Sequence, residues 1–286
     1  MLIPYIIGMR RISVLDLEKV KPLMSLNLSH HPGRRITTLL LEDASHTPEA
    51  IARVLEVLER VGGRILSIRP TSVGRELDIM VYAEVPDDVE ERVAEEVERL
   101  GICRQVSIID VPVKGLLMSI HFPQMVGDER SVVILKPIYS GIIRGLRERF
   151  GDEAAKTFLY YVGYEIGESL ASYVRRWDTA SLEEAVKNLL LIGRALGYAV
   201  HDVSQVSGDE VRLRLLENWE SDALGRGYRE PQCHLSRGVL NGYLDSFTGS
   251  SWSVEEAECW SRGDRGCLFI VRRRYPDRPS PALPEP

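Results

Sequence analysis

The chain has 286 residues, of which 44% are hydrophobic, and a formal net charge of -6 at pH 7; this length and composition suffice for two packed domains. Arg and Glu residues are interspersed without a basic stripe, which argues against direct binding of nucleic acid. No segment approaches the roughly 20 apolar residues of a membrane span, and four cysteines without a recognisable signal peptide favour a reducing, cytoplasmic setting.

Residues 1–34 show no clear periodicity, and we interpret them as an N-terminal extension. The next segment begins with the continuous apolar run Ile36–Leu41, which is typical of a buried strand. Thr47 is expected to cap a helix whose first position is Pro48, because proline is tolerated there. Apolar residues recur at helical spacing until Gly62, which ends the helix and precedes a further strand.

The remainder of this segment predicts a strand, a helix and a last strand. Apolar and polar residues alternate over Leu77–Glu84, as in a half-buried strand. Asp87 and Glu90 form a capping box that opens the second helix, and Val106–Ile109 is the last strand. Residues 35–112 therefore predict the order βαββαβ, which is the ferredoxin-like arrangement.

This segment resembles the ACT domain, a regulatory module that often binds amino acids at a dimer interface. The resemblance depends on Asp43, which precedes the first loop and helix, and on the run from Gly62 to Ile65 at the start of the second strand. The family's Pro-Gly at the helix start is replaced here by Thr47-Pro48, so the glycine that cradles the ligand is missing. The resemblance implies either an amino-acid site or a plain ferredoxin-like dimerisation module, and in both cases a homodimer.

A second domain is predicted over residues 113–274, followed by a disordered, Pro-rich tail at 275–286. Two strands, Lys114–Phe122 and Ser131–Leu135, are expected to open this domain on either side of a turn at Gly127.

Helices dominate the next part of the second domain. A long helix is predicted from Asp152, and it contains Gly163 and Gly167 one turn apart. Mid-helix glycine costs about 1 kcal/mol relative to alanine, so this pair indicates either close packing against a neighbour or room for a ligand. Ser181 and Glu184 form a capping box that opens another helix.

Strands return after these helices. Two strands are predicted about a turn at Ser207–Asp209, and Trp219 is expected to end the second of them. A helix then covers Cys233–Phe247.

The last predicted element is a β-hairpin that carries two cysteines. Apolar residues flank the Gly-Asp-Arg-Gly turn that separates Cys259 from Cys267. Glu256 lies three residues before Cys259, and Cys233 precedes both. Three thiolates and a carboxylate are a plausible tetrahedral zinc set. Buried core thiols and a disulfide between Cys259 and Cys267 are the alternatives.

The hairpin motif resembles that of the 4-vinyl reductase domain. The run E-x-x-C followed by G-D-x-x-C-x-F, with an earlier cysteine at this offset, carries the resemblance, which extends over roughly residues 115–274. That domain occurs in bacterial activators that sense aromatic compounds, in archaeal hydrocarbon-binding proteins and in bacteriochlorophyll-synthesis proteins, and its fold is similar to that of TRAPP vesicle-tethering subunits. The aromatic sensors hold a structural zinc with three Cys and one Glu, which implies Cys233, Glu256, Cys259 and Cys267 here.

One position departs from the pattern of the aromatic sensors. His234 follows the first cysteine where those sensors carry Trp. This histidine is either a competing metal ligand or a solvated loop residue. The two resemblances together imply an α+β chain, in which a ferredoxin-like domain precedes an α/β domain of the TRAPP-like, 4-vinyl reductase type.

The expected function is non-catalytic. A zinc with four protein ligands has no open position for a substrate water, and no nucleophile, P-loop or His-Glu-x-x-His motif is found in the sequence. The resemblance implies a sensor that binds a small hydrophobic or aromatic ligand in a mostly apolar pocket. Aromatic type and position select its expected lining: Phe158, Tyr161, Tyr164, Trp219 and Tyr243.

Two other functions remain open from the sequence. The second domain could be a TRAPP-like interaction module whose pocket is filled by its own side chains. It could also be an accessory of a vinyl-group reductase, although no motif for a redox cofactor is found.

Overall fold

The computed structural model describes residues 28–73, 75–86 and 88–274. These residues form two compact units, which we call the first unit (within residues 28–132) and the second unit (within residues 133–274). Most of the predicted N-terminal extension, Asp87 and the predicted tail lie outside the described residues. No helix in the described ranges combines the length and the apolar character that crossing a bilayer requires.

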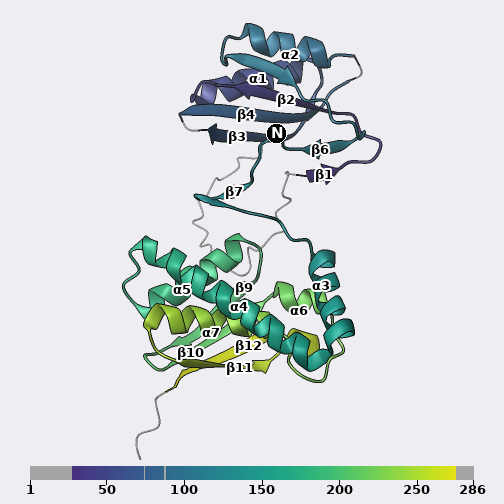
Figure 1. Ribbon diagram of the computed structural model, residues 1–286. Coiled ribbons are helices and arrows are strands. Elements are labelled where there is room, and N and C mark those ends of the chain that lie inside the picture. The colour runs from purple at the N-terminus through teal and green to yellow at the C-terminus, as the bar shows by residue number, and fades with distance from the viewer. Residues whose placement is uncertain (1–27, 74, 87, 275–286) are drawn as a thin grey trace, which may run out of the picture. The chain divides into compact units, whose positions relative to one another are not determined.

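The first unit is a four-stranded antiparallel sheet with two helices on one face (Figure 1). The strand order is β3-β4-β2-β5. The elements follow the chain as β2 Ile36–Glu42, α1 Pro48–Arg60, β3 Arg64–Val73, β4 Glu76–Glu84, α2 Glu90–Arg99 and β5 Gln105–Ile108. Alternate residues of β2 and β4 face the helices, because successive side chains of a strand point to opposite faces.

The other face of this sheet is covered by the segment that follows β5. Strand β6 Leu116–Met118 pairs with β1 Leu28–His30, and Leu117 is buried against Tyr82 and Met80. The compact units consequently meet between Val132 and Val133, whereas the sequence predicted a second domain from residue 113.

Two strands expected in this region differ from the observed ones. The predicted strand Lys114–Phe122 is reduced to the three residues of β6. A short hairpin of β7 Met125–Val126 and β8 Glu129–Arg130 follows, with the predicted turn at Gly127 between them. Residues 131–135 are not a strand, because no described segment pairs with them, and their apolar side chains are exposed.

The second unit is built on an antiparallel sheet of order β11-β12-β10-β9. Helices α5 and α7 lie against this sheet, and α4 packs along α7 (Figure 1). The strands are β9 Val200–Val206, β10 Glu210–Leu216, β11 Trp252–Glu258 and β12 Cys267–Arg273. The helices are α3 Lys136–Phe150, α4 Asp152–Val174, the short 3-10 helix η2 Arg175–Trp177, α5 Leu182–Ala195, α6 Trp219–Leu224, α7 His234–Thr248 and the short 3-10 helix η3 Trp260–Arg262.

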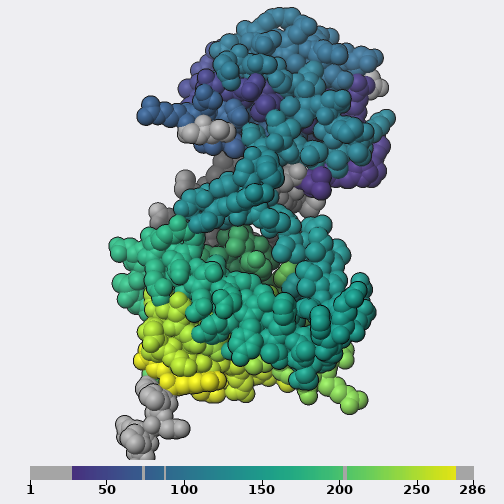
Figure 2. All heavy atoms as spheres, in the orientation of Figure 1, coloured from purple at the N-terminus to yellow at the C-terminus, as the bar shows by residue number. Residues whose placement is uncertain are grey.

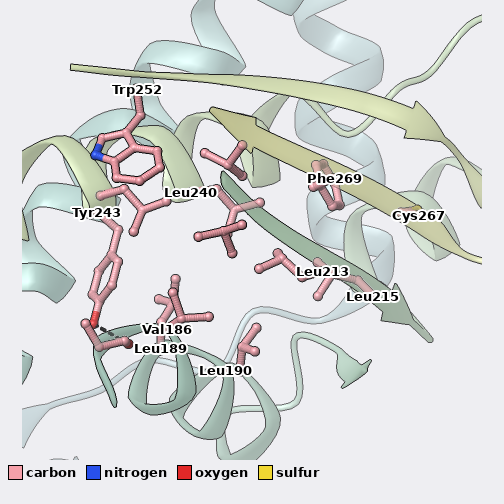
Figure 3. Packing of buried hydrophobic residues seen from close by; sticks show 14 of the residues in the cluster. Val186, Leu189, Leu190, Leu213, Leu215, Leu240, Tyr243, Trp252, Cys267 and Phe269 are labelled. Carbon is pink, nitrogen blue, oxygen red and sulfur yellow. Dashed lines mark hydrogen bonds between the residues drawn. The ribbon is translucent and has the colours of Figure 1, made fainter. Parts of the chain in front are cut away.

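Own side chains fill the core between α5, α7 and the sheet (Figure 3). Tyr243 is fully buried, and its hydroxyl donates a hydrogen bond of 2.7 Å to the carbonyl oxygen of Ala185. Trp252 is buried beside it at the start of β11. The predicted end of a strand at Trp219 is wrong: β10 ends at Leu216, and Trp219 begins α6 because Asn218 caps the helix by accepting from the amide of Glu220.

Helices α4 and α7 touch through their backbones. Gly163 and Gly167 of α4 face Gly238 and Gly242 of α7, and all four are buried. A Cβ atom at any of these positions would overlap backbone atoms of the opposite helix. Of the two explanations that the sequence left open for Gly163 and Gly167, close packing is therefore the correct one. The outer side of α4 forms part of the surface visible in Figure 2.

Candidate metal centre

Four side chains from separate elements converge at one end of the sheet of the second unit. Cys233 precedes α7, Glu256 lies on β11, Cys259 precedes η3, and Cys267 begins β12. We call these four residues the metal cluster. One ligand atom from each lies within 4.8 Å of every other, and all four side chains are buried. The structure thus brings together every residue of the predicted metal set.

The spacing within the metal cluster fits a tetrahedral metal ion. The Sγ atom of Cys233 lies 3.9 Å from that of Cys259 and 3.5 Å from that of Cys267. Four ligands around zinc, with metal–sulfur bonds of about 2.3 Å, would place neighbouring sulfur atoms about 3.8 Å apart. All four cysteines of the chain are free, so the disulfide between Cys259 and Cys267 is not formed.

A second observation points to a cation. The Oε2 atom of Glu256 accepts a hydrogen bond of 2.9 Å from the amide of Cys233, whereas its Oε1 atom is buried and has no partner among the described residues. A buried carboxylate oxygen without a partner is costly. A metal ion bound by the three sulfur atoms would supply that partner, so the cluster can hold a metal ion.

A β-bulge turns Glu256 toward the cluster. The register between β11 and β12 shifts at Ala257, so that Glu256 pairs with Phe269 while Glu258 pairs with the next residue, Leu268. Regular alternation would place Glu256 and Glu258 on the same face. With the bulge, Glu256 is buried, while Glu258 forms an ion pair with Arg214.

The turn between Cys259 and Cys267 is fixed by backbone contacts. Asp264 accepts a hydrogen bond of 2.9 Å from the amide of Cys259, and Gly263 has a φ of 118°, which favours glycine. A Cβ atom at Gly266 would lie 2.8 Å from the side chain of Leu216. These contacts bring both sulfur atoms to the same side of the hairpin.

Donors surround the sulfur atoms. The side-chain amide of Asn218 lies 3.4 Å from the Sγ atom of Cys233, and the backbone amide of Trp260 lies 3.4 Å from that of Cys267. Such donors stabilise thiolates, which are the form that binds metal.

Proton affinities in the cluster show the cost of gathering four acidic groups. Burial, followed by the nearby Cys259 thiolate, raises the pKa of Glu256 to about 8. Hydrogen bonds with the other two thiols, together with burial, raise the pKa of Cys233 well above its ordinary value. Hydrogen bonds from Cys233 and Cys267 lower the pKa of Cys259. One thiolate is thus shared by two thiols, and a divalent cation would displace the remaining protons.

Sequence reasoning missed a buried carboxylate next to the cluster. Glu220, on α6, accepts hydrogen bonds from the amides of Leu235 and Ser236 at 2.9 and 2.8 Å, and from the Ser236 hydroxyl at 2.7 Å. It thereby caps the first turn of α7, directly after Cys233. Burial raises the pKa of Glu220 to about 7. Its spacing to α7 carries no sequence signal, because the cap comes from another element.

His234 is neither of the two things that the sequence suggested. It is the first residue of α7 and is only 7% exposed, so it is not a solvated loop residue. It also does not belong to the set of atoms that converge in the metal cluster. Burial, aided by the nearby charges of Arg237 and Lys156, lowers the pKa of His234 to about 4, so the ring is neutral at pH 7.

The five aromatic residues expected to line one pocket are not gathered in one place. Phe158 and Tyr161 are exposed on α4, at 53% and 63%. The Tyr164 hydroxyl donates to Asp245, Trp219 packs on Tyr139, and Tyr243 is part of the filled core. Aromatic type alone could not separate these environments, because each position has a different neighbour from a distant element.

Several solved structures are similar to part of this chain. The phenol-responsive sensory domain of the transcription activator PoxR aligns with 52% of this chain and 79% of its own, at 16% identity and a TM-score of 0.48. A vinyl-4-reductase family protein from Methanocaldococcus jannaschii aligns with 51% and 85%, at 20% identity and a TM-score of 0.37. A trafficking protein particle complex subunit 3 from Naegleria fowleri, covalently bound to palmitic acid, aligns with 49% and 93%, at 17% identity and a TM-score of 0.42.

Sequence comparison gives two further findings. An uncharacterised protein of Methanocaldococcus jannaschii is 27% identical over 75 residues, which are 26% of this chain and 46% of that protein, so the chain spans less than half of that relative. Residues 216–273 match the family model of the 4-vinyl reductase domain. This segment contains the whole metal cluster, and the match supports the predicted 4-vinyl reductase domain in the second unit.

Proposed function

We propose that the second unit is a non-catalytic, small-molecule-sensing regulatory domain whose fold is closed by a structural zinc ion. The observation that carries this proposal is the buried cluster of three thiols and one carboxylate within the segment that matches the 4-vinyl reductase domain. Four protein ligands fill a tetrahedral site and leave no position for a substrate water. The ion therefore serves to join α7 to the β11–β12 hairpin rather than to catalyse a reaction.

The chemistry of the ligand set supports zinc as the metal. Thiolates are soft ligands, and a site with three sulfur atoms and one oxygen atom suits zinc better than magnesium or calcium, which prefer oxygen. The four free cysteines also agree with the reducing cytoplasm that we propose as the location.

The sensing role is supported by the sequence resemblance to aromatic sensors, through the same four residues. Under this proposal the ligand is a small hydrophobic or aromatic molecule. A second candidate is a ligand-free interaction module of the TRAPP type. The filled core around Tyr243 favours that alternative, because it leaves the space between α5, α7 and the sheet to the protein's own side chains (Figure 3).

For the first unit we propose an ACT-like, ferredoxin-like dimerisation domain that makes the chain a homodimer. The element order and the strand order β3-β4-β2-β5 support this proposal. The absence of a glycine at the start of α1, where Thr47 and Pro48 stand, argues for dimerisation without an amino-acid ligand.

The test is a thermal unfolding screen of the zinc-loaded full chain. Phenol, benzoate, toluene and a set of amino acids would be added separately, and zinc content and subunit number would be measured in the same preparation. We expect an aromatic compound to raise the unfolding temperature, since a ligand that binds the folded state stabilises it. A screen without any shift in protein that contains zinc would contradict the sensing role and favour the interaction module.

A further inference from the structure

A hollow of about 890 Å³ opens to solvent beside the metal cluster in the second unit. It is bordered by the first half of α4, the start of α7 and strand β11. The residues that matter below are Lys156, Tyr160, Tyr161, His234, Arg237 and Glu256. We call this space the hollow. It lies outside the filled core of Figure 3, so a ligand there would not have to displace core side chains.

Arg237 borders the hollow with an unpaired charge. Its guanidinium group forms neither a hydrogen bond nor an ion pair with any described residue, and its Nε atom is buried. Its described contact is with the ring of Tyr160, whose centroid lies 5.7 Å from the guanidinium carbon. A half-buried guanidinium group without a partner is costly, and its planar donors match a carboxylate.

His234 adds a second donor or acceptor without a partner. It is only 7% exposed and borders the hollow, and its Nε2 atom makes no hydrogen bond to a described residue. His234 and Arg237 stand three positions apart on α7, so their side chains lie on the same face of the helix. Buried polar atoms in native proteins are nearly always satisfied by protein, water or ligand. Two unsatisfied side chains at one hollow therefore indicate a bound group with acceptor oxygens.

The charges around the hollow restrict that group to a small net charge. Lys156, whose side chain is 17% exposed, lies on the inner side and pairs with Asp152 and Glu153 at 2.8 Å. Glu153, Glu230 and Glu255 are exposed at the border. Inner cations favour a carboxylate, whereas the acidic border disfavours a phosphate or another polyanion.

The aromatic border selects the remainder of the ligand. Tyr160 uses its hydroxyl to donate to Asn241 at 2.8 Å, which leaves its ring to border the hollow. Tyr161 packs edge-on against that ring, with centroids 5.4 Å apart, and is 63% exposed. Exposed aromatic faces of this kind bind flat apolar groups.

From these contacts we infer that the hollow is the binding site for an aromatic monocarboxylate. The carboxylate lies at Arg237 and His234, and the ring lies against Tyr161. This inference deepens the proposed sensing role, on which it rests, because it names the ligand class and a site different from the aromatic set that the sequence suggested.

Calorimetric titration of the zinc-loaded full chain with benzoate tests the inference. The variant Arg237→Met keeps the apolar stem on Tyr160 and removes the charge. Arg226→Met is the matched control, because Arg226 also stacks on an aromatic ring, that of Trp260, but does not border the hollow. We expect benzoate to bind the wild type and Arg226→Met equally, and Arg237→Met at least tenfold more weakly, with one zinc per chain in all three.

Two neutral probes separate this inference from the proposed function. Benzamide, which has the shape of benzoate without its charge, should bind at least tenfold more weakly than benzoate to the wild type. Equal affinity of benzoate for the wild type and Arg237→Met would overturn the inference. Binding of phenol together with no binding of benzoate would also overturn it, yet would leave the sensing role intact. If no aromatic compound binds, both fail.

Discussion

In the first unit, two amphipathic helices cover one face of a four-stranded sheet, and alternating apolar side chains of β2 and β4 meet them. The second unit also has four strands, but its helices α4 and α7 meet at four glycines and its last hairpin is joined to α7 by the metal cluster. The described part of the chain contains no other metal-ligating cluster of this kind. The comparison teaches that hydrophobic pattern suffices for the first unit, whereas the second depends on a few individual residues.

The largest expected difference between the units comes from the metal cluster. Removal of one ligand by Cys259→Ser should unfold the second unit, because structural zinc contributes on the order of 10 kcal/mol in small domains, which is comparable with the whole stability of a domain. All four tryptophans, Trp177, Trp219, Trp252 and Trp260, belong to the second unit, so their fluorescence reports that unit alone.

Cys103→Ser is the matched control, since Cys103 lies in the first unit outside the cluster. We expect native tryptophan emission in Cys103→Ser and unfolded emission in Cys259→Ser, with the circular dichroism of the first unit retained in both. Native emission and equal unfolding temperatures in the two variants would show that the cluster is only a set of buried thiols.

The second comparison concerns pH. The pKa of Glu220 is raised by burial to about 7 from an ordinary value of 4.5, so the folded state holds a proton that the unfolded state releases. The stability associated with Glu220 is therefore present below pH 4.5 and is lost as the pH rises through 7, by about 3 kcal/mol in total. Glu220→Gln should remove this loss.

Urea unfolding followed by tryptophan fluorescence at several pH values measures the effect. Because the wild type and Glu220→Gln share the metal cluster, the pH dependence of the cluster cancels in their difference. The wild type should lose stability relative to the variant between pH 5 and 8. A difference that does not change with pH would mean that Glu220 titrates normally.

The glycine contact gives a smaller effect. A Cβ atom at Gly238 would overlap the carbonyl oxygen of Tyr160, whereas one at Gly145, on α3, would meet nothing within 4 Å. Gly238→Ala should lower the free energy of unfolding by roughly 2 kcal/mol through overpacking. Gly145→Ala should leave it unchanged or raise it by up to about 1 kcal/mol through helix propensity. Equal effects in urea unfolding would contradict direct backbone contact between α4 and α7.

The smallest expected effect compares one helix cap from each unit. The Ser181 hydroxyl accepts a hydrogen bond of 3.1 Å from the amide of Glu184, whereas Thr47 caps α1 without a side-chain hydrogen bond. Ser181→Ala should therefore cost about 1 kcal/mol, and Thr47→Ala clearly less. Tryptophan fluorescence measures the first change and circular dichroism the second; a larger loss in Thr47→Ala would reverse the comparison.

Much of the secondary structure follows from local sequence. Helical spacing and capping signals predicted α1 and α4, and the flanks of the Gly263–Gly266 turn predicted the last hairpin. Strand Ser131–Leu135 was predicted wrongly, because an apolar run resembles a strand whether or not a partner strand is present. The boundary at residue 113 was misplaced for a similar reason: β6 pairs with β1, and such long-range pairing has no local signal.

The metal cluster was predictable because the hairpin brings Cys259 and Cys267 together and the motif matches a known ligand set. Its supports were not, because they come from elsewhere. The bulge at Ala257 that turns Glu256 inward is a matter of register, and the cap on α7 comes from Glu220 on α6. The aromatic pocket failed because residue type does not reveal which side chains share a space.

Native mass spectrometry of the full chain, purified without added metal, tests the central claim most directly. The account predicts that each chain carries the additional mass of one zinc ion and that Cys259→Ser carries none. A chain at its bare mass, or one lighter by the two hydrogens of a disulfide, would contradict the proposed role of the metal cluster.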